Sequence, residues 1–172
     1  MPHAEEVETS LVALGAVTFD GLSADFGLVE ARAKLSPYFT VASGVAYLHL
    51  EHGYREVQVR ASVTASAIIG RFTLEDRNLI YASSESVQRY RNRLRLTMPA
   101  LGGHSRLSAH VYDEIYFDLD RGGVVRNNLA LGLGASISDS WRAELYHVWS
   151  DNRAVGDIRY IMAMVSITFD CW

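Results

Sequence analysis

The stretch Arg89-Tyr-Arg-Asn-Arg-Leu-Arg-Leu-Thr97 decides which class of fold this sequence can adopt. Its four arginines stand at every second position. Because successive side chains of a β-strand point to opposite faces, a strand places all four on one face. The opposite face then carries Tyr90, Leu94, Leu96 and Met98. A helix would spread the arginines around most of its circumference and leave no apolar stripe. The stretch therefore predicts a strand with one cationic face and one apolar face.

Composition leaves two classes of fold open. The 172 residues suffice for one domain with a sizeable core, 49% of them are hydrophobic, and the mean hydropathy is +0.03. These values suit a soluble domain, and they equally suit a membrane barrel, in which apolar and polar residues alternate. No run of about 18 apolar residues is present, so no transmembrane helix is predicted. The net charge of -4 gives no argument for nucleic-acid binding, and the single cysteine, Cys171, excludes an internal disulfide bond.

About ten short runs of alternating polar and apolar residues follow one another along the chain. They occupy residues 7–19, 22–35, 38–50, 56–67, 71–81, 89–98, 106–117, 125–137, 141–149 and 160–169. The run 56–67 has the cleanest period of two, with polar residues at even positions and valine or alanine at odd ones. In the run 71–81, Glu75, Asp76 and Arg77 put charge on both faces, so we expect a bulge or a strand end there.

The number, length and connections of these runs predict an all-β fold. We expect a single antiparallel up-and-down transmembrane β-barrel of about ten strands, which occupy residues 7–169 of one domain, 1–172. Strands of roughly ten residues cross a bilayer when they are tilted. Short turns at 36–37, 70 and 138–140 alternate with longer polar connections at 118–123 and 150–157, as in outer-membrane barrels. The alternative is a soluble lipocalin-like ligand-binding barrel, or a sandwich, with its polar face turned to water.

In the barrel interpretation, the polar face lines the lumen. It mixes large charged side chains with glycine, which suits a crowded interior, and its charges must pair because they share a confined space. The predicted lumen charge network consists of Arg89, Arg91, Arg93, Arg95, Glu114, Arg126, Arg142 and Glu144. Folding the hairpin about Gly102 places Glu114 opposite Arg89, within a residue or two, with Arg126 diagonally beyond it. The arginine row could bind an anion, and the alternative is a purely structural ladder of ion pairs.

Aromatic residues near the predicted strand ends suit the interfaces of a membrane. We assign Trp141, Trp149 and Phe169 to this role. Every second residue back from Phe169 is apolar, which resembles the final strand of proteins delivered to the outer membrane. The first residues lack the basic and apolar regions of a signal peptide, so we expect a mature chain from which a signal has been removed.

Three stretches carry a resemblance to a known family. They are Arg89-Tyr-Arg-Asn-Arg-Leu-Arg-Leu96, Tyr112-Asp-Glu-Ile-Tyr-Phe-Asp118 and Arg126-Asn-Asn-Leu-Ala-Leu-Gly-Leu-Gly134, with Asp76-Arg-Asn-Leu79 as a fainter fourth. They resemble a bacterial family of outer-membrane barrels known as domain of unknown function 2490 (DUF2490). The resemblance implies a bacterial outer-membrane location and brings no activity. A barrel there would have as partners the lipid bilayer, lipopolysaccharide and, during biogenesis, the barrel-assembly machinery.

The sequence offers little for chemistry. His147-Val-Trp-Ser150-Asp-Asn152 is loosely similar to the His-x-Ser-Asn pattern of outer-membrane lipid A deacylases, but His147 and Ser150 are three residues apart and face opposite ways on a regular strand. The six histidines lack metal-ligand spacing, and Gly132-Leu-Gly134 is not followed by a helix. We therefore predict no cofactor, no metal and no catalysis: the barrel is structural or a narrow pore with a side-chain-filled, charged lumen.

Overall fold

The computed structural model describes residues 7–18, 23–50, 53–85, 88–99, 106–154 and 156–171. Ten strands account for most of them. They are β1 (Val7–Thr18), β2 (Ser23–Ser36), β3 (Phe39–Leu50), β4 (Arg55–Ile69), β5 (Phe72–Ser83), β6 (Gln88–Pro99), β7 (Leu107–Asp118), β8 (Val124–Ser136), β9 (Trp141–Asn152) and β10 (Gly156–Cys171). Among the described residues, no helix has the length and hydropathy needed for a membrane span.

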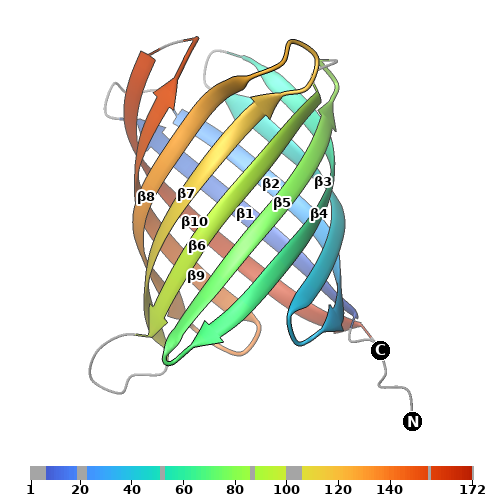
Figure 1. Cartoon of the computed structure of the whole chain (residues 1–172), viewed down its shortest axis with the longest axis vertical. Coiled ribbons are helices and arrows are strands. Elements are labelled where there is room, and N and C mark those ends of the chain that lie inside the picture. Colours follow the sequence, from blue (N-terminus) through green and yellow to red (C-terminus); the bar gives the residue numbers. More distant parts are fainter. Residues whose placement is uncertain are drawn as a thin grey trace.

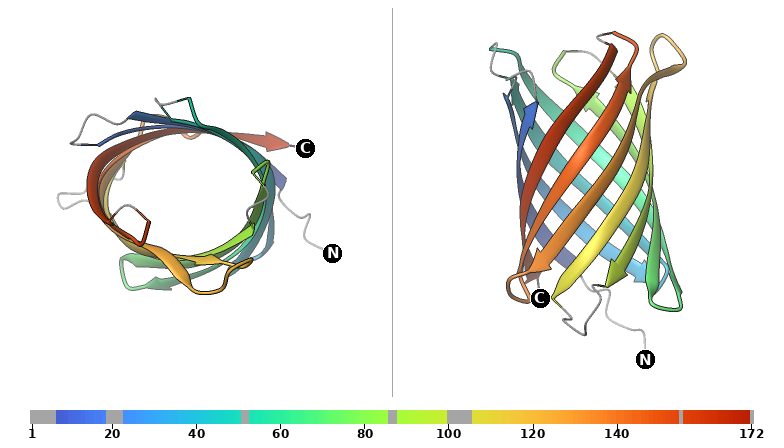
Figure 2. Two further views of the ribbon diagram at one scale, coloured as in Figure 1. Left: turned by 90° about the horizontal axis from the view of Figure 1, so that it is seen from above. Right: turned by 90° about the vertical axis from the view of Figure 1, so that its left-hand side faces the viewer.

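The ten strands close into a barrel, which confirms the predicted fold class. Each strand pairs antiparallel with its neighbours in the chain, and β1 pairs with β10 to close the ring (Figures 1 and 2). The start of β1 lies beside the end of β10, with Val7 opposite Cys171. We call this end of the barrel the terminal rim; the turns after β2, β4 and β8 share it (Figure 1). The opposite end, the loop rim, carries the connection 119–123.

The polar face of the strands points inward and the apolar face points outward. In β4, Glu56, Gln58 and Arg60 are 5–8% exposed, whereas the intervening Val57 and Val59 are 44% and 64% exposed. The same alternation in β8 gives buried Asn128 and Ala130 and exposed Leu129, Leu131 and Leu133. A soluble barrel with its polar face in water has the reverse arrangement, so the structure rules out that alternative.

Strand β5 is more regular than its charges suggested. It pairs without a shift along β4, from Gln58 opposite Ser83 to Ile69 opposite Phe72, and without a shift along β6. The bulge or strand end that we expected around Asp76 was therefore wrong. The charge on both faces has another cause: Glu75 and Arg77 line the lumen, while Asp76 points outward from a continuous strand.

Three lumenal glycines stand where a Cβ atom would clash with its surroundings. A Cβ atom at Gly132 would overlap the ring of Tyr146, and one at Gly134 would lie 2.6 Å from His110 Nε2 and 2.9 Å from Arg142 Nη2. A Cβ atom at Gly44 would overlap the backbone of β2 beside Glu30. Gly132 and Gly134 thus stand where large side chains from neighbouring strands occupy the interior, which is the role the sequence suggested for small residues, whereas Gly44 makes room for the backbone of β2.

We expect Gly132→Ala to destabilise the barrel. The ring of Tyr146 is 2% exposed and its hydroxyl is bonded to Glu144, so the ring cannot move aside to admit a methyl group. Overpacking of this kind costs about 1–3 kcal/mol in the free energy of unfolding. Denaturant unfolding in detergent would measure this loss. Gly27→Ala is the matched control, because nothing lies within 4 Å of a Cβ atom at Gly27. Equal effects of the two substitutions would contradict this account of the packing.

Candidate functional site: the lumen charge network

Three buried glutamates organise the charges inside the barrel. Glu30 on β2, Glu114 on β7 and Glu144 on β9 are 1%, 4% and 4% exposed. Each accepts hydrogen bonds from at least one arginine, and two of the three reach an arginine on a strand that is not adjacent to their own. Burial makes these contacts obligatory, since a carboxylate withdrawn from water is stable only when it is paired and hydrogen-bonded.

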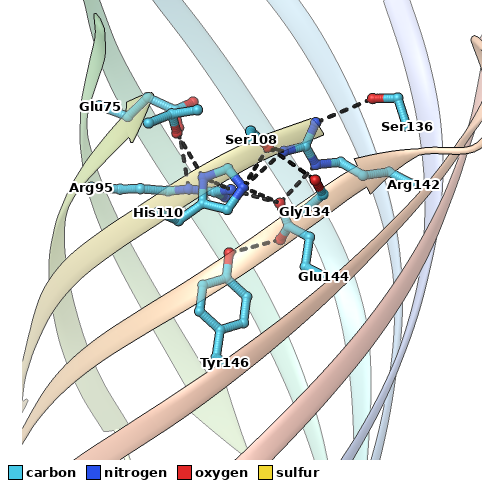
Figure 3. A network of polar contacts seen from close by, with 10 residues as sticks. Glu75, Arg95, Ser108, His110, Gly134, Ser136, Arg142, Glu144 and Tyr146 are labelled. Atoms are coloured by element: carbon cyan, nitrogen blue, oxygen red, sulfur yellow. Dashed lines mark hydrogen bonds and ion pairs between the residues drawn. The ribbon is translucent and has the colours of Figure 1, made fainter. Parts of the chain in front are cut away.

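The largest cluster surrounds Glu144 (Figure 3). Arg95 on β6 donates from Nη2 to Glu144 Oε1 at 2.6 Å, and Arg142 donates from Nε to the same oxygen at 2.7 Å. Tyr146 donates its hydroxyl to Glu144 Oε2 at 2.9 Å. The contact from Arg95 to Glu144 passes over β7 and β8, where Gly134 leaves the space open. This cluster therefore ties two sides of the barrel wall together across the lumen.

His110 on β7 fills the centre of the same cluster. Its side chain is buried, with Nδ1 3.0 Å from Arg95 Nη2 and Nε2 3.0 Å from Arg142 Nη2. Thr97 and Ser108 provide hydroxyl contacts at 3.0 and 2.8 Å. Sequence reasoning missed His110 because we counted it only as a scattered histidine without metal-ligand spacing. Its even position in the run 106–117 is the signal that placed it on the lumenal face.

Glu114 holds the second cluster, and its partner differs from the predicted one. Arg91 donates from Nη2 to Glu114 Oε1 at 2.5 Å, and Tyr116 donates its hydroxyl to Oε2 at 2.6 Å. In the β6–β7 register, Glu114 stands opposite Arg93, whereas Arg89 stands opposite Asp118. The prediction that Glu114 lies within a residue or two of Arg89 was therefore wrong. A turn centred at Gly102 would pair Glu114 with Tyr90, whereas the observed register of β6 and β7 is shifted by three residues from that pairing.

Arg126 lies diagonally beyond Glu114 on β8, as predicted, but its hydrogen-bond partners are other residues. It donates from Nε to Asn128 and Ser150 and from Nη2 to the hydroxyl of Tyr160, at 2.7–2.9 Å. No hydrogen bond or ion pair joins it to Glu114 within the described chain. Asn128 stands opposite Glu114 in the β7–β8 register, so Arg126 lies one lumenal position further along β8 and extends toward β9 and β10.

Glu30 forms a third cluster that the predicted network did not include. Arg77 on β5 donates from Nη2 to Glu30 Oε2 at 2.6 Å, and Arg32 donates from Nε to Oε1 at 2.8 Å. The contact from Arg77 to Glu30 passes over β3 and β4, whose positions along the way are occupied by Gly44 and Ser62. Sequence spacing cannot reveal such a pair, because 47 residues separate the two partners.

Arginines outnumber glutamates on the lumenal face. The arginines are Arg32, Arg60, Arg77, Arg89, Arg91, Arg93, Arg95, Arg126 and Arg142; the glutamates are Glu30, Glu56, Glu75, Glu114 and Glu144. Within the described chain, Arg60, Arg89 and Arg93 have no carboxylate within 4 Å. Arg60 lies 5.4 Å over the ring of Phe26 and Arg93 lies 5.7 Å over the ring of Tyr112, so aromatic faces take the place of carboxylates.

The predicted interface aromatics lie on the outer surface at two levels. Trp141 begins β9 at the terminal rim and is 46% exposed, and Phe169 near the end of β10 is 52% exposed. Trp149 lies near the loop-rim end of β9, where its ring stacks on His147 with 4.3 Å between centroids. His147 thus points outward, whereas Ser150 is 3% exposed and accepts from Arg126 inside. The two residues of the deacylase-like pattern do not meet.

A polar cavity of about 260 Å³ opens beside the Glu144 cluster. Thr73, Glu75, Arg95, Thr97 and Arg142 line it. In the part of the chain that the structure describes, no group of three or more His, Cys, Asp or Glu side chains is arranged to hold a metal ion.

The chain belongs to the family described as "Protein of unknown function (DUF2490)", whose model matches residues 26–159. This confirms the family resemblance found in the sequence. No curated protein sequence matches the chain.

Solved structures of outer-membrane proteins share the fold. An outer-membrane channel from Pseudomonas putida F1 has a TM-score of 0.57 at 8% identity, with 96% of each chain covered. The KdgM porin has a TM-score of 0.52 at 12% identity, with 95% of this chain and 99% of the porin covered. LpxR from Salmonella typhimurium has a TM-score of 0.53 at 9% identity, with 86% of this chain and 73% of LpxR covered. At these identities, the likeness establishes the outer-membrane β-barrel fold and nothing finer.

Removal of one partner of the Glu114–Arg91 pair tests whether the network stabilises the fold. We expect Glu114→Ala to lower the free energy of unfolding in detergent by about 3–5 kcal/mol, because it leaves the Arg91 guanidinium unpaired in a confined space. Arg91→Ala made on top of it should recover part of this loss.

Glu75→Ala is the matched control for Glu114→Ala. The Glu75 side chain is 35% exposed and its carboxylate lies 3.9 Å from Arg95, so its removal should cost about 0–1 kcal/mol. A loss below about 1 kcal/mol for Glu114→Ala, without coupling to Arg91, would show that this carboxylate is solvated.

Proposed function

We propose that this protein is an integral outer-membrane β-barrel whose charged lumen is filled by its own side chains, and that it serves as a structural barrel or a narrow pore without catalysis. The contacts from Arg95 to Glu144 and from Arg77 to Glu30 carry this proposal. Each crosses the interior over two intervening strands, so the charged groups obstruct the lumen and do not merely line it. The apolar outer surface supports the membrane location, because such a surface is stable only in lipid.

The lipid-facing surface also indicates the partners that we propose. Its exposed aliphatic side chains suit the acyl chains of the bilayer, and the loop rim would contact lipopolysaccharide in the outer leaflet. A barrel of this kind also requires the assembly machinery of the outer membrane for insertion. Nothing about the described surface favours nucleic acid as a partner.

An enzymatic role finds no support in the site, although LpxR shares the fold. His147 and Ser150 lie on opposite sides of the barrel wall, and a nucleophile and its base must lie within hydrogen-bonding reach. The lumenal His110 is held between two guanidiniums. The carboxylate oxygen beside it, Glu144 Oε1 at 3.5 Å from Nε2, already accepts hydrogen bonds from both arginines.

If ions do pass through the barrel, the excess of arginine would favour anions. Arg60 and Arg93 have no carboxylate partner in the described chain, and the Nε atom of each is buried without a hydrogen-bond acceptor. Guanidinium groups bind carboxylates and phosphates through paired hydrogen bonds, whereas they repel cations. The narrow-pore form of the proposal is therefore a small-anion pore.

The filled lumen predicts that sugar-sized solutes do not pass. A ten-stranded barrel is only slightly wider than an eight-stranded one, whose interior side chains just fill, and here arginine side chains occupy it. Liposomes that contain the reconstituted protein should therefore swell in isosmotic sugar solution at the rate of protein-free liposomes. Faster swelling would overturn the filled-lumen proposal and favour an open porin.

The proposed location predicts which arginines a protease reaches from outside. Exposed Arg121 and Arg153 lie in connections at the loop rim, and exposed Arg71 lies in the turn after β4 at the terminal rim. We expect trypsin added to intact cells to cut after Arg121 or Arg153 and to spare Arg71. Permeabilised cells, in which all three sites are accessible, provide the control. Cleavage of intact cells at Arg71 alone would reverse the orientation.

A further inference from the structure

One group of polar side chains interrupts the apolar outer surface. Asp76 and Asn78 on β5, Asn92 on β6 and Asp113 on β7 all point outward, and we call them the β5–β7 patch. Asn78 stands opposite Asn92, and Leu94, which is 47% exposed, stands opposite both Asp76 and Asp113. Outward neighbours such as Ile80 and Leu129 are 57% and 48% exposed, so the patch has an apolar border.

Hydrogen bonds inside the patch leave the donor group of Asn78 and the acceptor group of Asp113 unused. Asn92 donates its amide to Asp76 Oδ1 at 2.6 Å and to Asn78 Oδ1 at 3.2 Å, and the hydroxyl of Tyr90 also donates to Asn78 Oδ1. These contacts orient the Asn78 amide, whose N–H groups have no acceptor within the described chain. The Asp113 carboxylate likewise has no donor within that part of the chain.

The two unused groups lie at the same depth. Asn78 lies five residues before Ser83, the loop-rim end of β5, and Asp113 lies five residues before Asp118, the loop-rim end of β7. In tilted strands this distance corresponds to about 12 Å below the rim, which is inside the hydrocarbon layer. A carboxylate there is expensive to leave without a donor, so an intramembrane partner is expected.

Two-fold symmetry about the membrane normal would satisfy both groups at once. Such an axis exchanges the two sides of a surface and preserves depth. Strand β6 lies between β5 and β7, and its position 93 is also five residues from the loop-rim end of β6, at Gln88. An axis that passes beside Asn92 and Leu94 would therefore place Asn78 of one copy against Asp113 of the other, twice.

We propose that the β5–β7 patch is a homodimer interface in which the Asn78 amide of each copy donates to the Asp113 carboxylate of the other. The proposal rests on the membrane location proposed above. Interhelical amide and carboxylate contacts associate membrane-spanning segments because lipid offers no alternative partner, and the same reasoning applies to strands. A second copy fits this surface better than a different protein does, because the patch contains both the donor and the acceptor that it needs.

Cysteine cross-linking in native membranes tests this geometry. In a Cys171→Ser background, Leu94→Cys places a thiol beside the proposed axis, and mild oxidation should convert most of the protein to a disulfide-linked dimer. Leu145→Cys on β9 is the matched control: it is 54% exposed and points outward away from the patch, so it should remain monomeric. Equal cross-linking of the two variants, or none at Leu94→Cys, would overturn the proposal.

Variants of Asp113 test whether the patch itself holds the dimer. We expect Asp113→Leu to reduce cross-linking through Leu94→Cys at least tenfold and Asp113→Asn, which retains an acceptor, to preserve it. Unchanged cross-linking in Asp113→Leu would overturn the role of the pair, as would cross-links at Leu94→Cys to a different protein. Membrane fractionation separates the two proposals: a membrane-embedded monomer overturns only the dimer, whereas a chain outside the membrane fraction overturns the location as well.

Discussion

Ion pairs that cross the lumen are the contacts on which the interior of this barrel depends. A strand that turns arginine inward at every second position concentrates positive charge in a narrow space, and neighbouring strands alone do not supply enough carboxylates to balance it. Glu144 balances part of that charge from across the interior through Arg95, and Glu30 does the same for Arg77 of the adjacent strand β5. The glycines of β8 follow from the same need, because each leaves room for large side chains that lie above it. Confinement of charge in the lumen therefore accounts for glutamates and glycines on separate strands that look unrelated in the sequence.

Much of the fold could be predicted because it depends on a local rule. Alternation with a period of two assigns the two faces of each strand, and it placed Glu114, Glu144 and the arginine row on one face. The number of runs and their turns then predicted ten strands and an up-and-down barrel, which the structure contains. One strand alone does not show whether its polar face points into the barrel or out of it. The combination of large charged residues and glycine on the polar face favoured the lumen.

The partners within the lumen could not be predicted, for two physical reasons. The register of two strands depends on the centre of their hairpin. An error of one or two residues in that centre, which we placed at Gly102, moved the predicted cross-strand position of Glu114 from Arg93 toward Arg89. Contacts across the interior depend on the curvature of the closed wall, which brings Arg77 to Glu30 although three strand pairings separate them. Neither quantity is encoded in the spacing of residues along one strand.

Charge on both faces of a strand, as at Asp76, has different consequences in water and in lipid. In a soluble sheet, water solvates charge on both faces at little cost. A local bulge or strand end is then enough to explain why the alternation of polar and apolar residues breaks. In a lipid-facing wall, a regular strand with an outward carboxylate needs a hydrogen-bond donor that the chain itself supplies only in part, as Asn92 does for Asp76. Strand β6 illustrates the consequence: it turns arginines inward and Asn92 outward, so it gains less from lipid contact than the leucine-rich β8 does. Its place in the wall depends on hydrogen bonds with β5 and β7 on both faces, and polar contact with a second copy would extend that dependence beyond one chain.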